Sequence, residues 1–100
     1  RQENSINSIL YIETKSRKTL IHTEEGCFIS DEKINDLENW LETYGFYRSH
    51  KSYLTNMAKV EYIDKEFAYF KDNEKSYVSV RKYAETKKRY IAAKKKIAAM

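Results

Sequence analysis

Residues 45–56 read G-F-Y-R-S-H-K-S-Y-L-T-N, and this stretch decides how the chain is interpreted. Two strong cations, Arg48 and Lys51, stand in it among serine, threonine and tyrosine hydroxyls and the amide of Asn56. Phosphate oxygens accept hydrogen bonds from all of these side-chain types, and guanine edges accept them from Arg and Lys. By composition alone, the stretch is either a nucleic-acid contact or an ordinary polar loop.

The residues before this stretch predict three strands. Residues 9–13 (I-L-Y-I-E) are a short apolar run that suits a buried strand, and residues 18–23 alternate β-branched and polar side chains as a second strand. Residues 14–17 are the expected connection between the two. Gly26 then turns the chain into a third expected strand, residues 27–29.

One internal helix is predicted between the third strand and Gly45. Ser30 or Asp31 can cap its start, and Gly45 stands where a left-handed residue commonly ends a helix. Apolar residues recur between these ends at intervals of three and four, the pattern of a helix that buries one face against a core. This stripe consists of Ile34, Leu37, Trp40, Leu41 and Tyr44.

The residues that follow the central stretch predict further strands. Residues 59–63 suit a strand. Residues 67–70 and 77–83 suit the two arms of a hairpin, with the turn-forming pair Asp72-Asn73 between them. Because most of the predicted elements are short strands, the expected fold class is mainly β.

The second arm of this hairpin leads into a predicted C-terminal helix. In the arm, Val78 and Val80 share one face, and Arg81 lies near the strand's exit on the opposite, polar face. Residues 84–100 are rich in Ala, Lys and Ile and contain no helix breaker. We therefore expect a basic C-terminal helix, which should fray unless it docks on the rest of the chain.

The net charge of +4 is unevenly distributed. Residues 81–100 hold eight Lys and Arg against one acid, a net charge of +7, whereas residues 1–80 hold eleven bases against fourteen acids, a net charge of −3. A basic end on a mildly acidic body suggests a polyanionic partner, and a solvated tail is the alternative. We expect one domain over residues 1–83 and a basic helical tail over residues 84–100.

No group of side chains has the pattern of a catalytic, metal or cofactor site. Cys27 stands in the apolar run G-C-F-I and is expected to be a small buried hydrophobe. His22 and His50 lack partners at metal-ligand spacing, and His22 is expected to be a hydrogen-bonded strand residue. The sequence therefore predicts no enzyme activity, no metal and no cofactor.

The cellular location is predicted from absences in the sequence. No apolar run approaches the roughly 20 residues that span a bilayer, and no signal-peptide pattern opens the chain. A single cysteine makes an internal disulfide impossible, which fits a reducing compartment. We expect a cytoplasmic protein that does not bind membranes.

The order of the motifs resembles that of LytTR-type DNA-binding domains. The central stretch at 45–56 is followed by V-E-Y-I and preceded by I-L-Y-I-E, R-K-T-L-I-H-T and the helix stripe L-x-x-W-L. Y-V-S-V-R-K-Y at 77–83 completes a resemblance that covers residues 9–83 in order. Such domains are usually output modules of bacterial two-component response regulators. The resemblance thus implies sequence-specific binding of double-stranded DNA for transcription regulation.

The resemblance also implies a fold and a mode of DNA recognition. The fold is an elongated stack of small antiparallel sheets with one short helix, and its loops and strand ends enter successive major grooves. Lys51 and Arg81 match base-reading positions, and an Arg can pair bidentately with guanine O6 and N7. A third base-reading position lies in the first loop, where Arg17 and Lys18 both remain open.

The other polar residues of the central stretch are given supporting roles by the resemblance. Arg48 and Ser52 would hold phosphates and so fix the register on the duplex. His50, Tyr53 and Asn56 would structure the loop itself.

The sequence departs from the family pattern in two places. Thr55 stands where the family usually has an aliphatic residue, which we expect to alter packing only. The strand that the family has before the region matching residues 5–9 is expected to be truncated, which leaves one sheet edge open.

The expected partner is DNA, and two alternatives stay open. We expect the isolated chain to be monomeric and two copies to occupy tandem direct repeats on DNA. The first alternative is an RNA-binding β domain that stacks bases on exposed Tyr69, Tyr77 and Tyr83. The second is a protein-interaction module whose basic tail binds an acidic partner.

Overall fold

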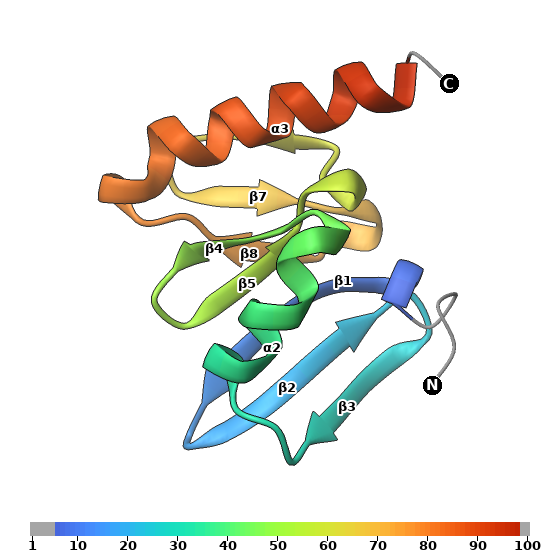
Figure 1. The fold of residues 1–100 in the computed structure, drawn as a ribbon, viewed down its shortest axis with the longest axis vertical. Coiled ribbons are helices and arrows are strands. Elements are labelled where there is room, and N and C mark those ends of the chain that lie inside the picture. Colours follow the sequence, from blue (N-terminus) through green and yellow to red (C-terminus); the bar gives the residue numbers. More distant parts are fainter. Residues whose placement is uncertain (1–5, 99–100) are drawn as a thin grey trace.

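The computed structural model describes residues 6–98, which form two antiparallel β-sheets, a short internal helix and a longer C-terminal helix (Figure 1). The first sheet has the strand order β3-β2-β1-β5-β4, and the second has the order β6-β7-β8. The strands are β1 (Ile9–Lys15), β2 (Lys18–Thr23), β3 (Gly26–Ser30), β4 (Phe46–His50), β5 (Tyr53–Asn56), β6 (Tyr62–Ile63), β7 (Phe67–Tyr69) and β8 (Lys75–Tyr77). The helices are α2 (Ile34–Leu41) and α3 (Tyr83–Ala98). The predicted mainly β stack of small sheets is confirmed.

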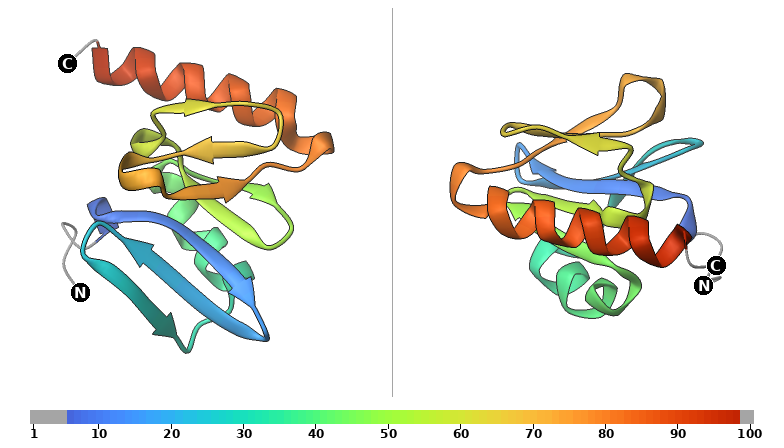
Figure 2. Two further views of the ribbon diagram at one scale, coloured as in Figure 1. Left: turned by 180° about the vertical axis from the view of Figure 1, so that it is seen from behind. Right: turned by 90° about the horizontal axis from the view of Figure 1, so that it is seen from above.

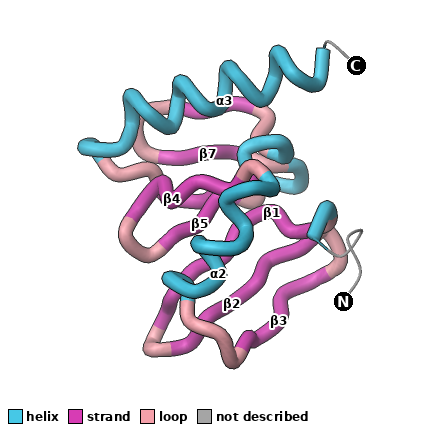
Figure 3. Tube along the Cα trace, in the orientation of Figure 1, coloured by secondary structure: helices cyan, strands magenta, loops and turns pink. Residues whose placement is uncertain are grey.

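The two helices make this stack almost as wide as it is long. Helix α2 lies across the first sheet, and α3 runs along the second (Figures 1 and 3). The principal axes measure 34 × 31 × 27 Å, so the expected elongation of the stack is not found in this chain.

Strand β1 is the central strand, and it is buried on both faces. Ile9 and Ile12 pack with α2 in one core, whereas Leu10 and Tyr11 pack in a second core under the three-stranded sheet. A register shift between Ile9 and Tyr11 in the pairing with β2 accompanies this change of side. A strand covered on both faces explains why residues 9–12 are continuously apolar.

The connection between β1 and β2 is shorter than the sequence suggested. Both strands continue until Lys15 pairs with Lys18, so the turn consists only of Ser16 and Arg17. Their φ angles are +52° and +66°, which is the left-handed geometry of a tight two-residue hairpin. The predicted connection over residues 14–17 was therefore two residues too long.

Strand β3 is the exposed edge of the first sheet, and the predicted burial of Cys27 is wrong. Cys27 is exposed, and Phe28 and Ile29 remain 55% and 66% exposed. No residue of β3 belongs to either core, because the cores form over β1, β4 and β5. The prediction failed because an apolar run alone does not distinguish an edge strand from a central one.

Helix α2 begins later than predicted and ends as predicted. Its N-cap is Lys33, without a side-chain cap, whereas the hydroxyl of Ser30 accepts a hydrogen bond from the amide of Glu32 in the preceding turn. Ile34, Leu37 and Leu41 are buried and Trp40 packs against them, but Tyr44 is 43% exposed. Gly45 ends the segment with a φ of +88°.

The chain between the two sheets contains less strand than the sequence predicted over residues 59–63. Met57–Lys59 forms a single helical turn, which Asn56 caps by accepting a hydrogen bond from the amide of Ala58 at 3.3 Å. Only β6 within this segment is a strand. The cap withdraws residues 57–59 from the sheet.

The second hairpin is confirmed, but its last arm lies earlier than predicted, because β8 (Lys75–Tyr77) shares only Tyr77 with the predicted arm over residues 77–83. Asp72 and Asn73 adopt left-handed conformations between β7 and β8, as expected for the turn. The chain leaves the sheet after Tyr77, so Val78 is buried while Val80 is 89% exposed. The shared face predicted for these two valines, and the strand position predicted for Arg81, are therefore wrong.

Helix α3 forms as predicted and docks on the body. Tyr83, Tyr90 and Ala93 pack against the second core, and the Tyr90 hydroxyl donates a hydrogen bond to the carbonyl of Glu61 at 2.8 Å. These contacts oppose fraying, whereas the division into a domain and a tail at residue 83 stays a prediction. Within residues 6–98, no helix is long and apolar enough to cross a membrane. The expected truncated strand falls on or before residues 1–5, outside the described residues.

Candidate nucleic-acid interface

Three turns lie in a row at one edge of the molecule, and they carry the predicted DNA-contacting cations. We call them the edge turns: the first is residues 16–17, the second residues 51–52 and the third Val80–Lys82. In Figure 1 they follow one another along the left side, and in the reversed view of Figure 2 they follow one another along the right side.

Two backbone hydrogen bonds align the edge turns. The antiparallel pairing of β1 with β5 brings their ends together, and the amide of Thr14 donates to the carbonyl of Ser52 at 2.9 Å. The amide of Ser79 donates to the carbonyl of Ser49, also at 2.9 Å, which draws the third turn from the second sheet toward the second turn. Residues far apart in the sequence therefore form one continuous edge.

The cations of this edge are presented to solvent. Arg17 and Lys18 are exposed at the first turn, Lys51 at the second and Arg81 at the third. Each edge turn thus has at least one exposed cation on it or next to it.

Arg48 holds the second edge turn from within the protein. Its guanidinium donates from Nε and Nη2 to the carbonyl of Lys51, and from Nη1 to Glu38 Oε1 at 2.8 Å and Asn35 Oδ1 at 2.9 Å. Four of its five N–H groups are thereby used, since Nη1 carries two and Nε one. The structure places Arg48 as a brace between α2 and the turn, and its predicted phosphate contact remains a prediction.

His50 and Ser52 make a local hydrogen bond that closes the second edge turn. The Ser52 amide donates to His50 Nδ1 at 3.0 Å, which requires an unprotonated Nδ1. Burial and then the charges of Lys51 and Arg48 lower the pKa of His50, so the neutral ring is favoured. The ring also contacts Tyr53 and Tyr77, with centroid distances of 5.4 and 5.8 Å.

Tyr53 anchors the base of the second edge turn to β1. Its hydroxyl donates to Glu13 Oε1 at 2.8 Å, and His22 Nε2 lies 2.6 Å from the other oxygen of Glu13. Burial, followed by the bond to Glu13, raises the pKa of Tyr53. The expectation that His22 is hydrogen-bonded within its strand environment is confirmed.

Asn56 connects the same strand pair at the opposite end of β5. Its side-chain nitrogen donates to the carbonyl of Ile9 at 2.8 Å, while the residue is only 4% exposed. These contacts lie away from the second edge turn, so the role expected of Asn56 in structuring that loop stays a prediction.

The architecture and the family model agree. The model of the LytTr DNA-binding domain matches residues 4–96 of the sequence. The chain belongs to the LytTr DNA-binding domain family. Among solved structures, it is similar to the LytTr DNA-binding domain of a protein described as a methyl-accepting/DNA response regulator from Bacillus cereus, with 22% identity and a TM-score of 0.75 over 83% of this chain and 81% of that chain. No curated protein sequence matches the chain.

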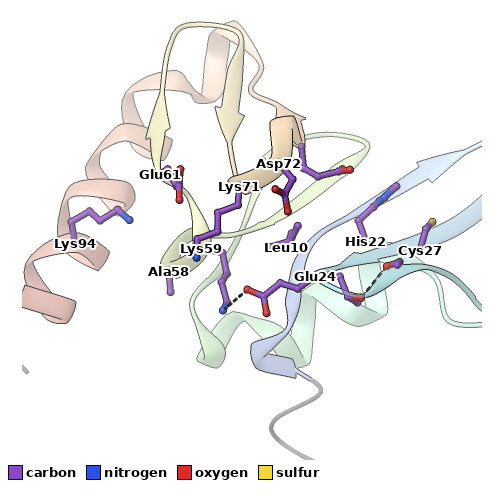
Figure 4. Close-up of a pocket in the computed structure, with 13 residues that line it drawn as sticks. Leu10, His22, Glu24, Cys27, Ala58, Lys59, Glu61, Lys71, Asp72 and Lys94 are labelled. Carbon is purple, nitrogen blue, oxygen red and sulfur yellow. Dashed lines mark hydrogen bonds and ion pairs between the residues drawn. The ribbon is translucent and has the colours of Figure 1, made fainter.

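This LytTr domain also has a wide hollow, which lies away from the edge turns. The hollow has a volume of about 690 Å³ and lies between the two sheets (Figure 4). Charges of both signs line it, including an ion pair between Lys59 and Glu24 at 3.0 Å, with Lys71 and Lys94 nearby. Among residues 6–98, no group of three or more His, Cys, Asp and Glu side chains is placed to hold a metal ion.

Two features of this LytTr edge were missed in the sequence. Val80 is an exposed apolar side chain on the third edge turn, and assigning it to a strand concealed this. Glu38 and Asn35 brace Arg48 from α2, and no sequence pattern links residues so far from the central stretch. An acid and an amide on the polar face of a predicted helix look like ordinary solvent-exposed side chains.

Proposed function

We propose that this LytTr domain binds double-stranded DNA sequence-specifically and serves as the output domain of a transcriptional response regulator. Each of the second and third edge turns would enter a major groove, with the first turn contacting DNA beside them. The observation that carries this proposal is the alignment of the three edge turns by the Thr14–Ser52 and Ser79–Ser49 backbone bonds. Regulator membership is supported by the similar domain from Bacillus cereus.

Individual residues receive distinct roles in this proposal. Lys51 and Arg81 read base edges, and Arg81 can pair with the O6 and N7 atoms of guanine. Arg17 or Lys18 supplies a third contact from the first turn. Val80, 89% exposed beside Arg81, suits contact with the methyl group of thymine.

Phosphate contacts would hold the register. Ser52 is half-buried next to Lys51 and can donate from its hydroxyl, whereas Arg48 has one N–H left for a phosphate after its four internal bonds. Arg48 therefore contributes mainly by shaping the turn. We further propose that the domain alone is monomeric and that two copies occupy tandem direct repeats.

Selection of bound duplexes from a random-sequence pool tests this function. The wild-type chain should enrich one sequence family, and it should bind the enriched duplex more tightly than a scrambled duplex of the same composition. Specific binders typically show a ratio of about 10³ or more. Equal affinity for both duplexes would contradict the proposal.

A second candidate function is stacking of single-stranded RNA on the three-stranded sheet. Tyr62, Phe67, Tyr69 and Tyr77 share its outer face, and Tyr62 and Tyr77 are 57% and 47% exposed. Tyr83 does not join them, because it packs against the second core from α3. Competition of single-stranded RNA against the selected duplex separates the two candidates, since a stacking domain would prefer the RNA.

A further inference from the structure

A chain of three buried hydroxyl groups joins the two sheets behind the edge turns. Ser49 of β4, Thr55 of β5 and Ser76 of β8 are each fully buried. Thr55 Oγ1 lies 2.9 Å from Ser49 Oγ and 2.8 Å from Ser76 Oγ. Ser49 Oγ also donates to the carbonyl of Tyr77 at 2.8 Å.

The donor and acceptor roles of these three hydroxyl groups can be arranged in one order only. Each hydroxyl has a single proton, and that of Ser49 is used on the Tyr77 carbonyl. Ser49 Oγ must therefore accept from Thr55, and Thr55 Oγ1 must in turn accept from Ser76. Such a directed series strengthens each bond through polarisation, and it leaves no alternative arrangement if one member is lost.

Ser49 is the point where this chain meets the DNA-binding edge. It lies two residues before Lys51. Its carbonyl accepts the hydrogen bond from the amide of Ser79 that holds the third edge turn. Its side chain holds Tyr77, the last residue of β8. The same residue therefore fixes one end of the second edge turn and the start of the segment that carries Arg81.

We propose that the Thr55 hydroxyl is a positioning group for DNA recognition, because it locks the spacing between the second and third edge turns through Ser49 and Ser76. This inference rests on the proposed function. The expectation that Thr55 alters packing only is corrected by its two side-chain hydrogen bonds, to which the proposal gives a role. Thr55 itself is fully buried and touches no DNA.

Replacing Thr55 by Val removes the hydroxyl and keeps the shape of the side chain. The Ser76 proton then loses its acceptor and Ser49 Oγ loses its donor, both in a buried place without access to water. The two serines must move to find other partners, and the sheets that they connect move with them. Simultaneous hydrogen bonds from Lys51 and Arg81 to bases of one DNA site tolerate little relative displacement of the two turns.

The test measures the affinities of Thr55→Val and Thr55→Ser for the duplex selected by the wild-type chain and for its scrambled form. Thr55→Val should reduce the cognate-to-scrambled ratio by about tenfold, within the range of coupling through a shared network. Thr55→Ser, which keeps the hydroxyl, should restore the ratio to within about twofold of wild type. Binding to the scrambled duplex should not change.

Thr23→Val is the control for the loss of a threonine hydroxyl. The Thr23 hydroxyl donates to the carbonyl of Gly26 at 2.9 Å in the turn between β2 and β3, at the opposite end of β2 from the first edge turn, and it links no sheets. Its ratio should stay at the wild-type value. Far-UV circular dichroism at the binding temperature shows that each variant is folded, and Ser76→Ala, which cuts the link to β8 with a smaller change, provides a second variant with the same expected direction.

The outcomes separate the two proposals. An unchanged ratio in both Thr55→Val and Ser76→Ala, or a Thr55→Ser variant as impaired as Thr55→Val, would overturn the positioning role and leave the proposed function intact. A wild-type chain that prefers no duplex would overturn both. A further expected sign is that Arg81→Ala costs less affinity for the cognate duplex in the Thr55→Val background than in wild type, because the contact is already weakened.

Discussion

Arg48 illustrates how a single side chain can shape a binding edge without belonging to its exposed surface. It connects β4 to α2 through Glu38 and donates hydrogen bonds to the carbonyl of Lys51. Its side chain is only 16% exposed. A Lys cannot make these forked bonds, so Arg48→Lys should lower the free energy of unfolding by about 1–2 kcal/mol. Urea denaturation measures this loss.

Arg89 offers a matched control for this prediction. Its pair with Glu85 is exposed, with both side chains 44% exposed, and its guanidinium lies 4.4 Å from the centroid of the Tyr47 ring; a Lys can keep both contacts. Arg89→Lys should change the free energy of unfolding by less than about 0.5 kcal/mol. Equal losses in the two variants would show that Arg48 is an ordinary surface ion pair and does not brace the turn.

His50 makes stability depend on pH in a defined direction. Its pKa is lowered in the folded protein, so the unfolded chain binds the proton more readily. The contribution of His50 is therefore retained above the unfolded value of about 6.5, and stability is lost as the pH falls below it. Unfolding of wild type and His50→Gln should be compared between pH 7.5 and 5.5. A difference between the two that stays constant over this range would contradict the assignment.

At the scale of residues, the sequence predicted the hydrogen bonding of a side chain better than its burial. The hydrogen-bonded state of His22 was predicted correctly, because a polar ring in a strand needs a partner, and Glu13 provides one. Cys27 and Val80 were assigned wrongly, since burial depends on which elements cover a strand. That information lies in the tertiary structure and not in the local pattern of side chains.

Helix α3 is the element whose charge invites a test. Lys87, Lys88, Lys95 and Lys96 are exposed on it, while Tyr90 and Ala93 hold it on the second core. If these lysines contact phosphates, replacing all four by Gln should reduce the slope of log affinity against log salt by about 0.9 for each lost contact. The substitution keeps the helix docked, which deletion of the segment would not.

A control for this experiment comes from the second sheet. Lys71 and Lys75 are exposed at the end of the second sheet opposite the third edge turn, and their replacement by Gln should leave the slope unchanged. An unchanged slope in the α3 variant would show that the basic end is only solvated. A change in both variants would indicate a general charge effect.

At the scale of elements, most strands could be predicted, but β4 and β5 could not, because residues 46–56 have no clear period. The ends of the predicted strands were also inexact. The β1–β2 hairpin is two residues tighter than expected because Ser16 and Arg17 both adopt left-handed conformations. β8 ends early because the amide of Ser79 bonds to β4 and leaves its own sheet. Both deviations arise from geometry that no side-chain periodicity encodes.

The whole molecule allows a test of assembly on DNA. Two copies on direct repeats about 20–21 base pairs apart would face the same side of the duplex, and about five added base pairs would turn one copy away. We expect residues 1–100 alone to be monomeric and to bind both spacings with equal affinity, since the proposed edge needs no dimer contact. Titration of both duplexes, with sedimentation of the free protein, measures this. Strong spacing dependence would reveal a contact between copies.

At this scale, the strand order is what sequence patterns could not supply. β1 pairs with β5, which lies about forty residues further along the chain, and this pairing places the first and second edge turns together. The apolar run of residues 9–13 predicted β1, whereas β5 was not predicted as a strand, because residues 46–56 show no clear period. The resemblance of the motif order to LytTR domains supplied the expectation that these loops act as one surface.

The central claim, that the edge turns recognise a DNA sequence, is tested most directly by Arg81→Ala and Lys51→Ala on the selected and scrambled duplexes. Each variant should lose about 1–3 kcal/mol of binding free energy on the selected duplex and much less on the scrambled one, with the preference relaxed at the base that it contacts. Equal losses on the two duplexes would contradict the account, because they would make both residues phosphate contacts without a role in sequence recognition.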